Sequence, residues 1–389
     1  MKLKVLFISA WYPNRYDGMA GLFVWKHAQA VSRFCDVKVL YVHADENIKE
    51  FEVICKNDNG IEEIYVYYPF RKDKVFHKIR KTINYFRAYR KGFKFLKNHN
   101  WKPEIIHVNI LTRTAFIAYL QKTFNKIPYV ITEHWSRYFP QNKTYKGWLR
   151  KRVTEFVVKR AEVLMPVSNY LKNAMSDYNL SNKHTVIINN VVDDFFFEHS
   201  DKKEQRTKKR ILHISCFDER AKNICGLLNA TKLLSDIRTD FELVIVGTGK
   251  DFEKCYRHYE SLNFPKDAVK FIGEITPREV SHYLQNSDFS MMFSNYENAP
   301  VVISESLAAG VPVICTNVGG IPEMVNASNG ILVDVGNEME LSEKMDFMLD
   351  NFGKYDSEKI RKEAEKYSFQ NVGEKIFKIY KQICHENQE

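Results

Sequence analysis

The chain has 389 residues, of which 44% are hydrophobic and 27% are charged, and this composition is typical of a folded protein rather than a disordered one. Its length predicts two domains. No apolar run approaches the ~20 residues that span a bilayer, which argues against a membrane-spanning protein. The short apolar stretch at residues 5–11 is interpreted as a buried strand, because it lacks the cleavage site of a signal peptide.

Cysteine content and charge distribution add two expectations. The seven cysteines are scattered and form no Cys-x-x-Cys pair, which predicts free thiols in a reducing, cytoplasmic compartment rather than disulfides or zinc. The net charge of +10 is uneven: residues 1–200 carry 33 Lys and Arg against 18 Asp and Glu, or +15, whereas the remainder carries −5. The basic character therefore belongs to the first half of the chain.

The first predicted elements are a buried strand at residues 4–9, a loop at 11–21 and a helix from 22 to about 34. A loop of this kind, containing Gly18 and Gly21, can bring backbone close to a phosphate. Residues 37–42 predict the next strand, and residues 50–68 predict a strand and a hairpin.

Residues 71–100 predict a very basic helix in which Asp73 is the one acidic residue. Its apolar residues recur at helical spacing: Phe76, Ile79, Ile83, Phe86, Tyr89, Phe93 and Leu96. Two interpretations stay open at this point. The helix either packs on the core and leaves a solvated basic face, or it lies on a membrane surface.

Two further strands, at residues 104–109 and 130–134, end in polar residues that include His107 and His134. Residues 145–164 predict a helix followed by a strand. Residues 201–210 are charged and lack apolar periodicity, so we expect the linker between the two domains there.

The second half of the chain opens with a strand at 211–215 and a loop at 217–223 that contains Arg220 and Lys222. A strand at 269–275 follows, and residues 276–279 read as a capping box with proline at the first helical position.

The longest informative stretch runs from residue 289 to residue 334 and reads as strand, loop, helix, strand, loop, helix. Ligands bind beyond the carboxyl ends of strands in such sheets, where Glu297 is expected. Glu305 follows one or two turns into the helix. Backbone N–H groups near Val301 and Val302 suit a phosphate, and the two carboxylates suit hydroxyl groups on either side of it. A nucleotide sugar has this layout of groups.

The same residues carry a family resemblance. Glu297, seven residues and then Glu305, followed by Ala-Gly-Val-Pro-Val-Ile and Val-Gly-Gly-Ile-Pro-Glu, resemble the signature of retaining family-4 glycosyltransferases of the GT-B fold. The resemblance implies an α/β protein with two Rossmann-like, doubly wound domains that face each other across a cleft. It implies an acceptor-binding domain at 1–200, a linker at 201–210, a nucleotide-sugar-binding domain at 211–366 and a C-terminal helix at 367–389 that crosses back to the first domain.

The resemblance also implies roles for individual residues. His134 and Glu297 match the catalytic positions. The donor-binding positions are matched by Gly21, Arg220, Lys222, Gly273, Asn298, Ala299, Pro300, Val301, Val302 and Glu305. One departure stands out, because Cys216 occupies the position at which the family usually has an arginine that addresses the diphosphate. Arg220, in the same loop, is the expected substitute.

The expected chemistry is transfer of a sugar from a nucleotide-sugar substrate to a glycan or lipid-linked acceptor, with no cofactor. Because the chain has no Asp-x-Asp, we expect no metal site for the diphosphate. Two rival functions remain, a sugar-nucleotide epimerase on the same fold and a basic nucleic-acid-binding protein. The latter is disfavoured because no compact recognition motif is present. We expect a cytoplasmic enzyme, and the sequence leaves open whether it docks peripherally on the anionic inner face of the cytoplasmic membrane.

Overall fold

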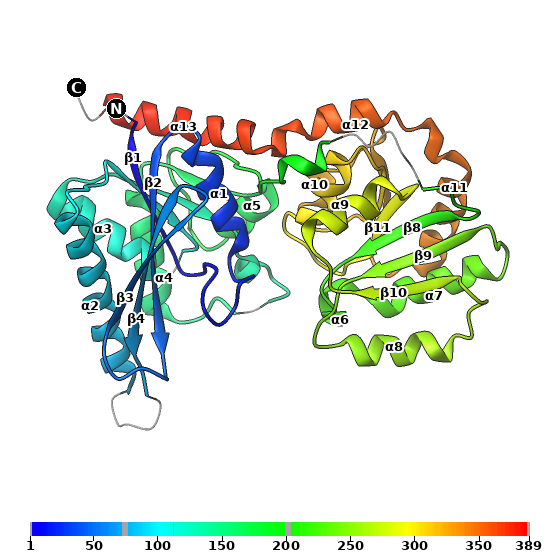
Figure 1. The fold of residues 1–389 in the computed structure, drawn as a ribbon, viewed down its shortest axis with the longest axis horizontal. Coiled ribbons are helices and arrows are strands. Elements are labelled where there is room, and N and C mark those ends of the chain that lie inside the picture. Colours follow the sequence, from blue (N-terminus) through cyan, green and yellow to red (C-terminus); the bar gives the residue numbers. More distant parts are fainter. Residues whose placement is uncertain (1, 72–76, 112, 143, 199–203, 387–389) are drawn as a thin grey trace. The chain divides into compact units, whose positions relative to one another are not determined.

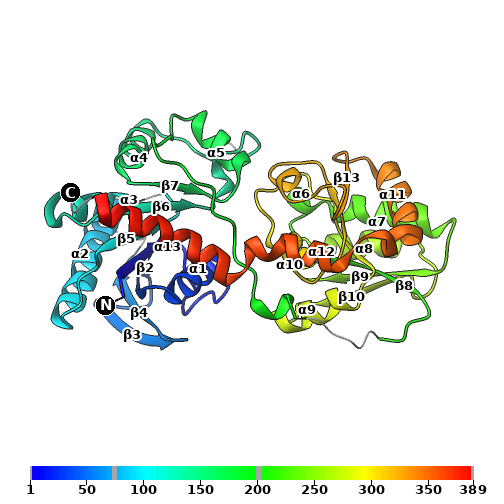
Figure 2. The same cartoon turned by 90° about the horizontal axis from the view of Figure 1, so that it is seen from above.

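The computed structural model describes residues 2–71, 77–111, 113–142, 144–198 and 204–386 (Figure 1). The chain divides into two compact units, Met1–Val191 with Phe369–Glu389, and Val192–Ser368, which we call unit 1 and unit 2. Each unit consists of one sheet with helices on both of its faces (Figures 1 and 2). This is the doubly wound α/β arrangement that the sequence predicts.

Unit 1 contains a seven-stranded sheet in the order β3-β4-β2-β1-β5-β6-β7. The edge strand β3 is antiparallel to β4, and the other pairs are parallel. The strands are β1 (Lys4–Ser9), β2 (Asp36–Asp45), β3 (Glu52–Asp58), β4 (Ile61–Pro69), β5 (Ile105–Asn109), β6 (Tyr129–Glu133) and β7 (Leu164–Pro166). The helices are α1 (Leu22–Ser32), α2 (His77–Asn98), α3 (Arg113–Asn125), α4 (Trp148–Arg160), α5 (Asn169–Ser176) and α13 (Phe369–Glu386).

Unit 2 contains a six-stranded parallel sheet in the order β10-β9-β8-β11-β12-β13. Its strands are β8 (Lys209–Ile214), β9 (Phe241–Val246), β10 (Val269–Gly273), β11 (Phe289–Met292), β12 (Val313–Thr316) and β13 (Gly330–Val333). Its helices are α6 (Glu219–Lys222), α7 (Ile224–Ser235), α8 (Phe252–Ser261), α9 (Pro277–Gln285), α10 (Val301–Ala308), α11 (Glu338–Asn351) and α12 (Ser357–Ala364). Apolar cores fill both sides of this sheet, which explains why apolar residues of its central strands are buried on both faces.

Local signals in the sequence set several of these elements. The capping box predicted at the start of α9 is confirmed, since the Thr276 hydroxyl accepts the Glu279 N–H and the Glu279 carboxylate accepts the Thr276 N–H. Pro300 is the N-cap of α10, and Gly310, with φ of 75°, follows its C-terminal end. The helix predicted around Glu305 is therefore present with the expected start and stop.

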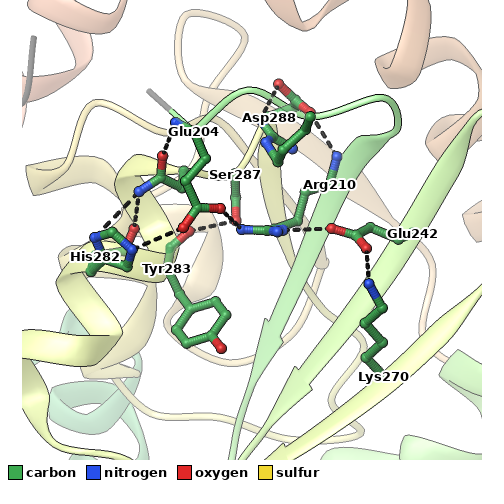
Figure 3. Close-up of polar contacts among 10 residues, drawn as sticks. Glu204, Arg210, Glu242, Lys270, His282, Tyr283, Ser287 and Asp288 are labelled. Atoms are coloured by element: carbon green, nitrogen blue, oxygen red, sulfur yellow. Dashed lines mark hydrogen bonds and ion pairs between the residues drawn. The ribbon is translucent and has the colours of Figure 1, made fainter. Parts of the chain in front are cut away.

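Of the predicted linker at residues 201–210, the structure describes residues 204–210. These residues are not a free connection between domains. Ion pairs hold residues 204–210 on unit 2 (Figure 3). Arg206 pairs with Asp288 at 3.1 Å, and Arg210 pairs with Glu204 at 2.9 Å and with Glu242 at 2.7 Å. Charged residues of this segment therefore take part in an ion-pair network. The strand β8 also begins inside the predicted linker, at Lys209.

The chain changes from unit 1 to unit 2 between Val191 and Val192, earlier than the linker that the charge pattern predicts. The reason is burial: Val192 and Phe196 are fully buried in the core of unit 2. Val192 also donates its N–H to the Tyr367 carbonyl at 2.9 Å and pairs with Ser368. The two chain segments at the ends of unit 2 are therefore hydrogen-bonded to each other.

The C-terminal helix α13 belongs to unit 1, where it packs against α1. A glycine makes this contact close, because a Cβ on Gly373 would stand 2.2 Å from the carbonyl oxygen of Ala30. Tyr380 extends from the same helix into the unit 1 core, and its hydroxyl lies 2.5 Å from Nδ1 of His107. The end of the chain is thus an integral layer of the first sheet domain.

Candidate functional site

The sheet topology predicts where each unit can bind a ligand. In a doubly wound sheet the binding crevice opens beyond the strand ends at the point where the strand order reverses. In unit 2 the order reverses between β8 and β11, and the segments that follow these strands carry Lys222 and Glu297. In unit 1 it reverses between β1 and β5, and the loop after β1 ends at Gly21. Lys222, Glu297 and Gly21 therefore follow switch-point strands, whereas His134 follows β6 and Gly273 ends β10.

The unit 2 site centres on an ion pair between Lys222 and Glu297. The Lys222 ammonium nitrogen lies 2.5 Å from Oε1 of Glu297, and Ser294 donates its hydroxyl to the same oxygen at 2.8 Å. The side chains of Lys222 and Glu297 are only 16% and 10% exposed. Burial lowers the pKa of Lys222, but the neighbouring Glu297 carboxylate raises it by more, so the net shift is upward. The lysine is therefore charged at neutral pH.

Gly319 supports the loop that carries Glu297. Gly319 has φ of 61°, and a Cβ on it would stand 1.9 Å from the Glu297 carbonyl oxygen. Only glycine combines this left-handed conformation with so close an approach. Gly319 belongs to the Val-Gly-Gly-Ile-Pro-Glu motif, which gives no sign that this glycine lies against Glu297, and Ser294 is a site residue that was not predicted from the sequence.

The N-terminal end of α10 continues the unit 2 site. Residues 297–300 lead into α10, and the first N–H groups of a helix, near Val301 and Val302, have no partner within the helix. Asn298 and Ala299 are half-buried just before it, and Glu305 is half-buried in its second turn. Along the chain, these N–H groups therefore come between the carboxylates of Glu297 and Glu305. This is the order predicted for binding a diphosphate that has hydroxyl groups on either side of it.

The loop after β8 contains both Cys216 and its expected substitute, Arg220. Cys216 is exposed, whereas Arg220 and Lys222 share the short helix α6. The Arg220 carbonyl accepts a hydrogen bond from the Asn295 side chain at 3.2 Å, which ties α6 to the loop of Glu297. The backbone of Arg220 is thus held next to the ion pair. Gly273, with φ of 82°, ends β10, and its carbonyl accepts the Gly247 N–H at 2.7 Å.

In unit 1, Gly21 is the N-cap of α1 and has a positive φ of 66°. A Cβ on this residue would stand 2.4 Å from the Trp11 carbonyl oxygen, so glycine is required for both conformation and space. The loop between β1 and α1 therefore folds back on itself at the strand end. Gly18 has open space around its Cβ position, which gives it no comparable packing role.

His134 follows β6 at the same sheet edge and is half-buried. Its ring packs against those of Phe23 and His27 of α1, with centroids 4.3 and 5.1 Å away. Its two nitrogens lie 3.3 Å from the side-chain oxygens of Asn109 and Asn190. Burial, and to a lesser degree His27, lowers the pKa of His134 well below its ordinary value. The ring is therefore neutral at pH 7 and suited to hydrogen bonding rather than to donating a proton.

Two neighbouring residues have structural roles. His107 is fully buried and bonded to Tyr380 and Thr132, which favours packing over chemistry. Glu133 was not predicted, and it organises the loop after β6. Its carboxylate accepts the N–H groups of residues 111, 134 and 135 and the hydroxyl of Tyr138. Burial raises the Glu133 pKa, while these hydrogen bonds oppose the rise. This carboxylate holds the backbone on both sides of His134.

The basic helix of unit 1 differs from its predicted packing in one respect. Phe76, which the helical spacing places in the apolar row, lies outside the residues that the structure describes. Tyr85, Tyr89 and Leu96 face the core, whereas Ile79 and Ile83 are 58% and 46% exposed. The buried row shares Tyr89 and Leu96 with the predicted one but also includes Gly92, where a Cβ would stand 2.4 Å from Leu40, and it leaves out Ile79 and Ile83.

The exposed face of α2 combines cations with apolar groups. It borders two hollows of about 250 and 600 Å³. Basic residues line both of them, namely Lys49, Arg71, Arg80, Lys81, Arg87 and Lys91, together with one acidic residue, Glu50, and the apolar residues Ile48, Phe51, Pro69, Phe70, Ile79 and Ile83. We call this the α2 surface. Among the described residues, no helix is long and apolar enough to cross a membrane.

Comparisons with known proteins define the family. The model of glycosyl transferases group 1 matches residues 194–367, and the model of Glycosyltransferase Family 4 matches residues 24–194. Together the two models account for both units. The chain therefore belongs to the group 1/family 4-type glycosyltransferases, and its two Rossmann-like units make up the GT-B fold.

Individual relatives agree with this membership. The N-acetyl-alpha-D-glucosaminyl L-malate synthase of Bacillus anthracis is 27% identical over 296 residues, which are 69% of this chain and 74% of the relative. The GalNAc-alpha-(1->4)-GalNAc-alpha-(1->3)-diNAcBac-PP-undecaprenol alpha-1,4-N-acetyl-D-galactosaminyltransferase of Campylobacter jejuni is 21% identical over 364 residues, or 92% of this chain and 93% of the relative. The structure of Anabaena HepE in complex with UDP has a TM-score of 0.71 at 15% identity and covers 98% of this chain and 100% of that one.

Proposed function

We propose that the protein is a retaining, metal-independent glycosyltransferase that moves a sugar from a nucleotide-sugar donor to a lipid-linked glycan in bacterial surface polysaccharide synthesis. The observation that carries the proposal is the buried Lys222–Glu297 pair beside the N-terminal end of α10. A paired cation and a helix N-terminus stabilise a leaving diphosphate. The carboxylate lies next to them, where it can address the transferred sugar.

The proposed step is a substitution on one face of the sugar. The bond between the anomeric carbon and the diphosphate oxygen breaks as the acceptor oxygen forms a bond to the same carbon. The acceptor hydroxyl proton passes to the departing phosphate oxygen. Lys222, Arg220 and the α10 N–H groups stabilise the charge that develops on the diphosphate, which is where preorganised donors have most effect.

The remaining residues divide the donor between them. Glu305 accepts hydrogen bonds from the ribose hydroxyls. Glu297 accepts them from the transferred sugar and stabilises positive charge at its anomeric carbon. His134 is neutral because burial lowers its pKa, so it holds a sugar hydroxyl rather than acting as an acid at pH 7. No cofactor enters this scheme, since the nucleotide sugar is a substrate.

Two of the similar proteins support the choice of substrates. The HepE structure contains UDP, which makes UDP-sugars the first donors to test. The Campylobacter jejuni relative is named for an acceptor that carries diphospho-undecaprenol, which supports a lipid-linked acceptor here. Neither the epimerase nor the nucleic-acid-binding alternative is favoured by the family membership.

A product analysis tests the proposed function. The protein is incubated with a UDP-sugar, with and without undecaprenyl-diphosphate glycans, and the products are followed by mass spectrometry and proton NMR. We expect UDP release that depends on the acceptor, and a product with the anomeric configuration of the donor. Release of free or epimerised sugar without an acceptor would favour the epimerase, and an inverted product would refute the retaining mechanism.

Metal independence gives a separate prediction. Because lysine and backbone N–H groups take the place of a bridging cation in this scheme, transfer should retain most of its rate in excess EDTA. The measurement is the initial rate after EDTA treatment, with and without added Mg²⁺ or Mn²⁺. A complete loss that Mg²⁺ restores would contradict the scheme.

The α2 surface supports peripheral docking on an anionic membrane. The helix contains no acidic residue, and its exposed Ile79 and Ile83 lie among cations. An anionic leaflet attracts each nearby Lys or Arg by about 1 kcal/mol, and exposed apolar side chains add an interfacial term. Docking by this surface would hold unit 1 at the place where a lipid-linked acceptor resides.

Vesicle binding checks this part of the proposal. We expect co-sedimentation with phosphatidylglycerol-containing vesicles at low salt, and its loss at high salt because surface charges are screened. Changing Lys78, Arg80, Lys81 and Arg87 to Glu should abolish binding. A matched control changes four basic residues of unit 2, Lys254, Arg257, Lys266 and Lys354, to Glu and should bind more than the α2 variant. Equal binding to neutral and anionic vesicles would remove the membrane from the proposal and leave the transferase standing.

A further inference from the structure

Two of the seven cysteines meet in unit 2 although they are far apart in the sequence. Cys225 lies on α7 and Cys255 on α8, and Glu219 of α6 completes the group. One ligand atom from each residue lies within 4.8 Å of the other two. Cys255 is fully buried, and Glu219 and Cys225 are partly buried. The spacing of these residues gave no sign of a metal site, because three separate helices bring the side chains together.

The geometry of this group fits a tetrahedral metal ion. Zinc binds sulfur at about 2.3 Å and carboxylate oxygen at about 2.0–2.2 Å, so neighbouring sulfur and oxygen ligands of one ion lie about 3.5 Å apart. Oε2 of Glu219 lies 3.5 Å from Sγ of Cys255. In the structure the Cys255 thiol donates a hydrogen bond to this oxygen, and the same separation fits one edge of a coordination tetrahedron once the thiol proton is replaced by the metal ion.

Ligand chemistry selects the kind of ion. Two thiolates and one carboxylate favour a thiophilic ion such as Zn²⁺ over Mg²⁺ or Ca²⁺, which prefer oxygen ligands. The carboxylate is also fixed in place, since Glu219 accepts the N–H groups of Ile224 at 2.7 Å and Cys225 at 3.2 Å. Such outer hydrogen bonds orient a ligand before the metal binds.

We propose that Glu219, Cys225 and Cys255 form a zinc site that fastens α6 to α7 and α8. Water completes the fourth position. Glu219 and Lys222 lie on the same single turn of helix, so the ion stabilises the segment that carries the diphosphate-binding lysine. Zinc has a structural role in this site and takes no part in the transfer step, so its removal by EDTA should lower the stability of unit 2 while most of the transfer rate is retained. The inference is independent of the proposed function, because the site needs no nucleotide sugar.

The test uses the full-length chain, reduced and freed of metal, with Zn²⁺ and Co²⁺ as the probes. We expect one equivalent of Zn²⁺ to bind, and Co²⁺ in its place to give a thiolate-to-cobalt charge-transfer band. Cys225→Ser and Cys255→Ser should each weaken Zn²⁺ binding at least about 100-fold. Losing a residue that only hydrogen-bonds to a metal ligand costs about 10–100-fold, so a larger loss marks a direct ligand. Cys55→Ser, an exposed cysteine of β3, is the control and should bind like the parent.

A second measurement needs no variant and so does not depend on how well the variants fold. Zn²⁺ should protect Cys225 and Cys255 from alkylation by iodoacetamide, read by peptide mass spectrometry, and should leave Cys55 reactive. Absence of stoichiometric Zn²⁺ binding, a Co²⁺ spectrum without the charge-transfer band, or equal alkylation with and without Zn²⁺ would each overturn the proposal. So would a Cys225–Cys255 disulfide that forms readily in the presence of saturating Zn²⁺.

Discussion

Replacing Glu297 with alanine is expected to lower kcat by about 10²–10³-fold, the cost of removing one preorganised group that stabilises transition-state charge. Binding of free UDP should change little, because Glu297 is assigned to the sugar and not to the nucleotide. Glu305→Ala, in contrast, should weaken the binding of free UDP. Loss of a charged acceptor of the ribose hydroxyls costs about 1.5–3 kcal/mol, or roughly 10–150-fold in the Kd for UDP.

Calorimetry with UDP and initial rates with the UDP-sugar distinguish these two expectations. The pair of variants serves as its own control, since both remove a glutamate from one segment of unit 2. Glu297→Gln, which keeps the size and removes the charge, tests whether the charge matters. Equal losses of UDP affinity in both alanine variants would overturn the division of roles between the two carboxylates.

Lys222→Met should weaken the contribution of the diphosphate to binding. Wild-type protein is expected to bind UDP more tightly than uridine, because the charged lysine addresses the phosphates. Removing one charge-assisted hydrogen bond should reduce this preference by about 10–150-fold. The rate should fall as well, since Glu297 would lose a partner that lies 2.5 Å away.

A surface lysine supplies the matched control for this variant. Lys232 pairs with Asp236 on the surface of α7, and such exposed pairs contribute 1 kcal/mol or less. Lys232→Met should therefore leave the preference for UDP over uridine unchanged. If Lys222→Met weakens UDP and uridine binding by the same factor, Lys222 does not act on the diphosphate.

Local sequence signals account for much of unit 2. The capping residues of α9, the proline before α10 and the glycine after it each act through neighbours a few residues away, so their effect is visible in the sequence. The predicted linker is the instructive exception. Its charges resemble those of a solvated connection, and only the fold brings Asp288 and Glu242 next to Arg206 and Arg210.

The details of the candidate site depended on contacts between distant residues. Helical spacing identified α2 but could not tell which row of side chains the sheet would cover, since Ile79 is exposed and Gly92 is buried. The motif singled out Glu297 and Lys222, yet the close approach of Gly319 to Glu297 follows from the fold. For the same reason, the sequence gives no sign that Cys225 and Cys255 meet in the fold.

The measurement that tests the central claim most directly is thermal unfolding in the presence of UDP-, GDP-, ADP- and TDP-sugars. At about 100 times its Kd, the true donor should add about 2.7 kcal/mol to the stability of unit 2. That gain corresponds to a rise of roughly 5–10 °C for a domain of this size. We expect such a rise with one of these nucleotide sugars, and at the same ligand concentration a gain of only about half or less in the Glu305→Ala variant. No stabilisation by any of the four, together with stabilisation by RNA that fades steeply with salt, would contradict this expectation.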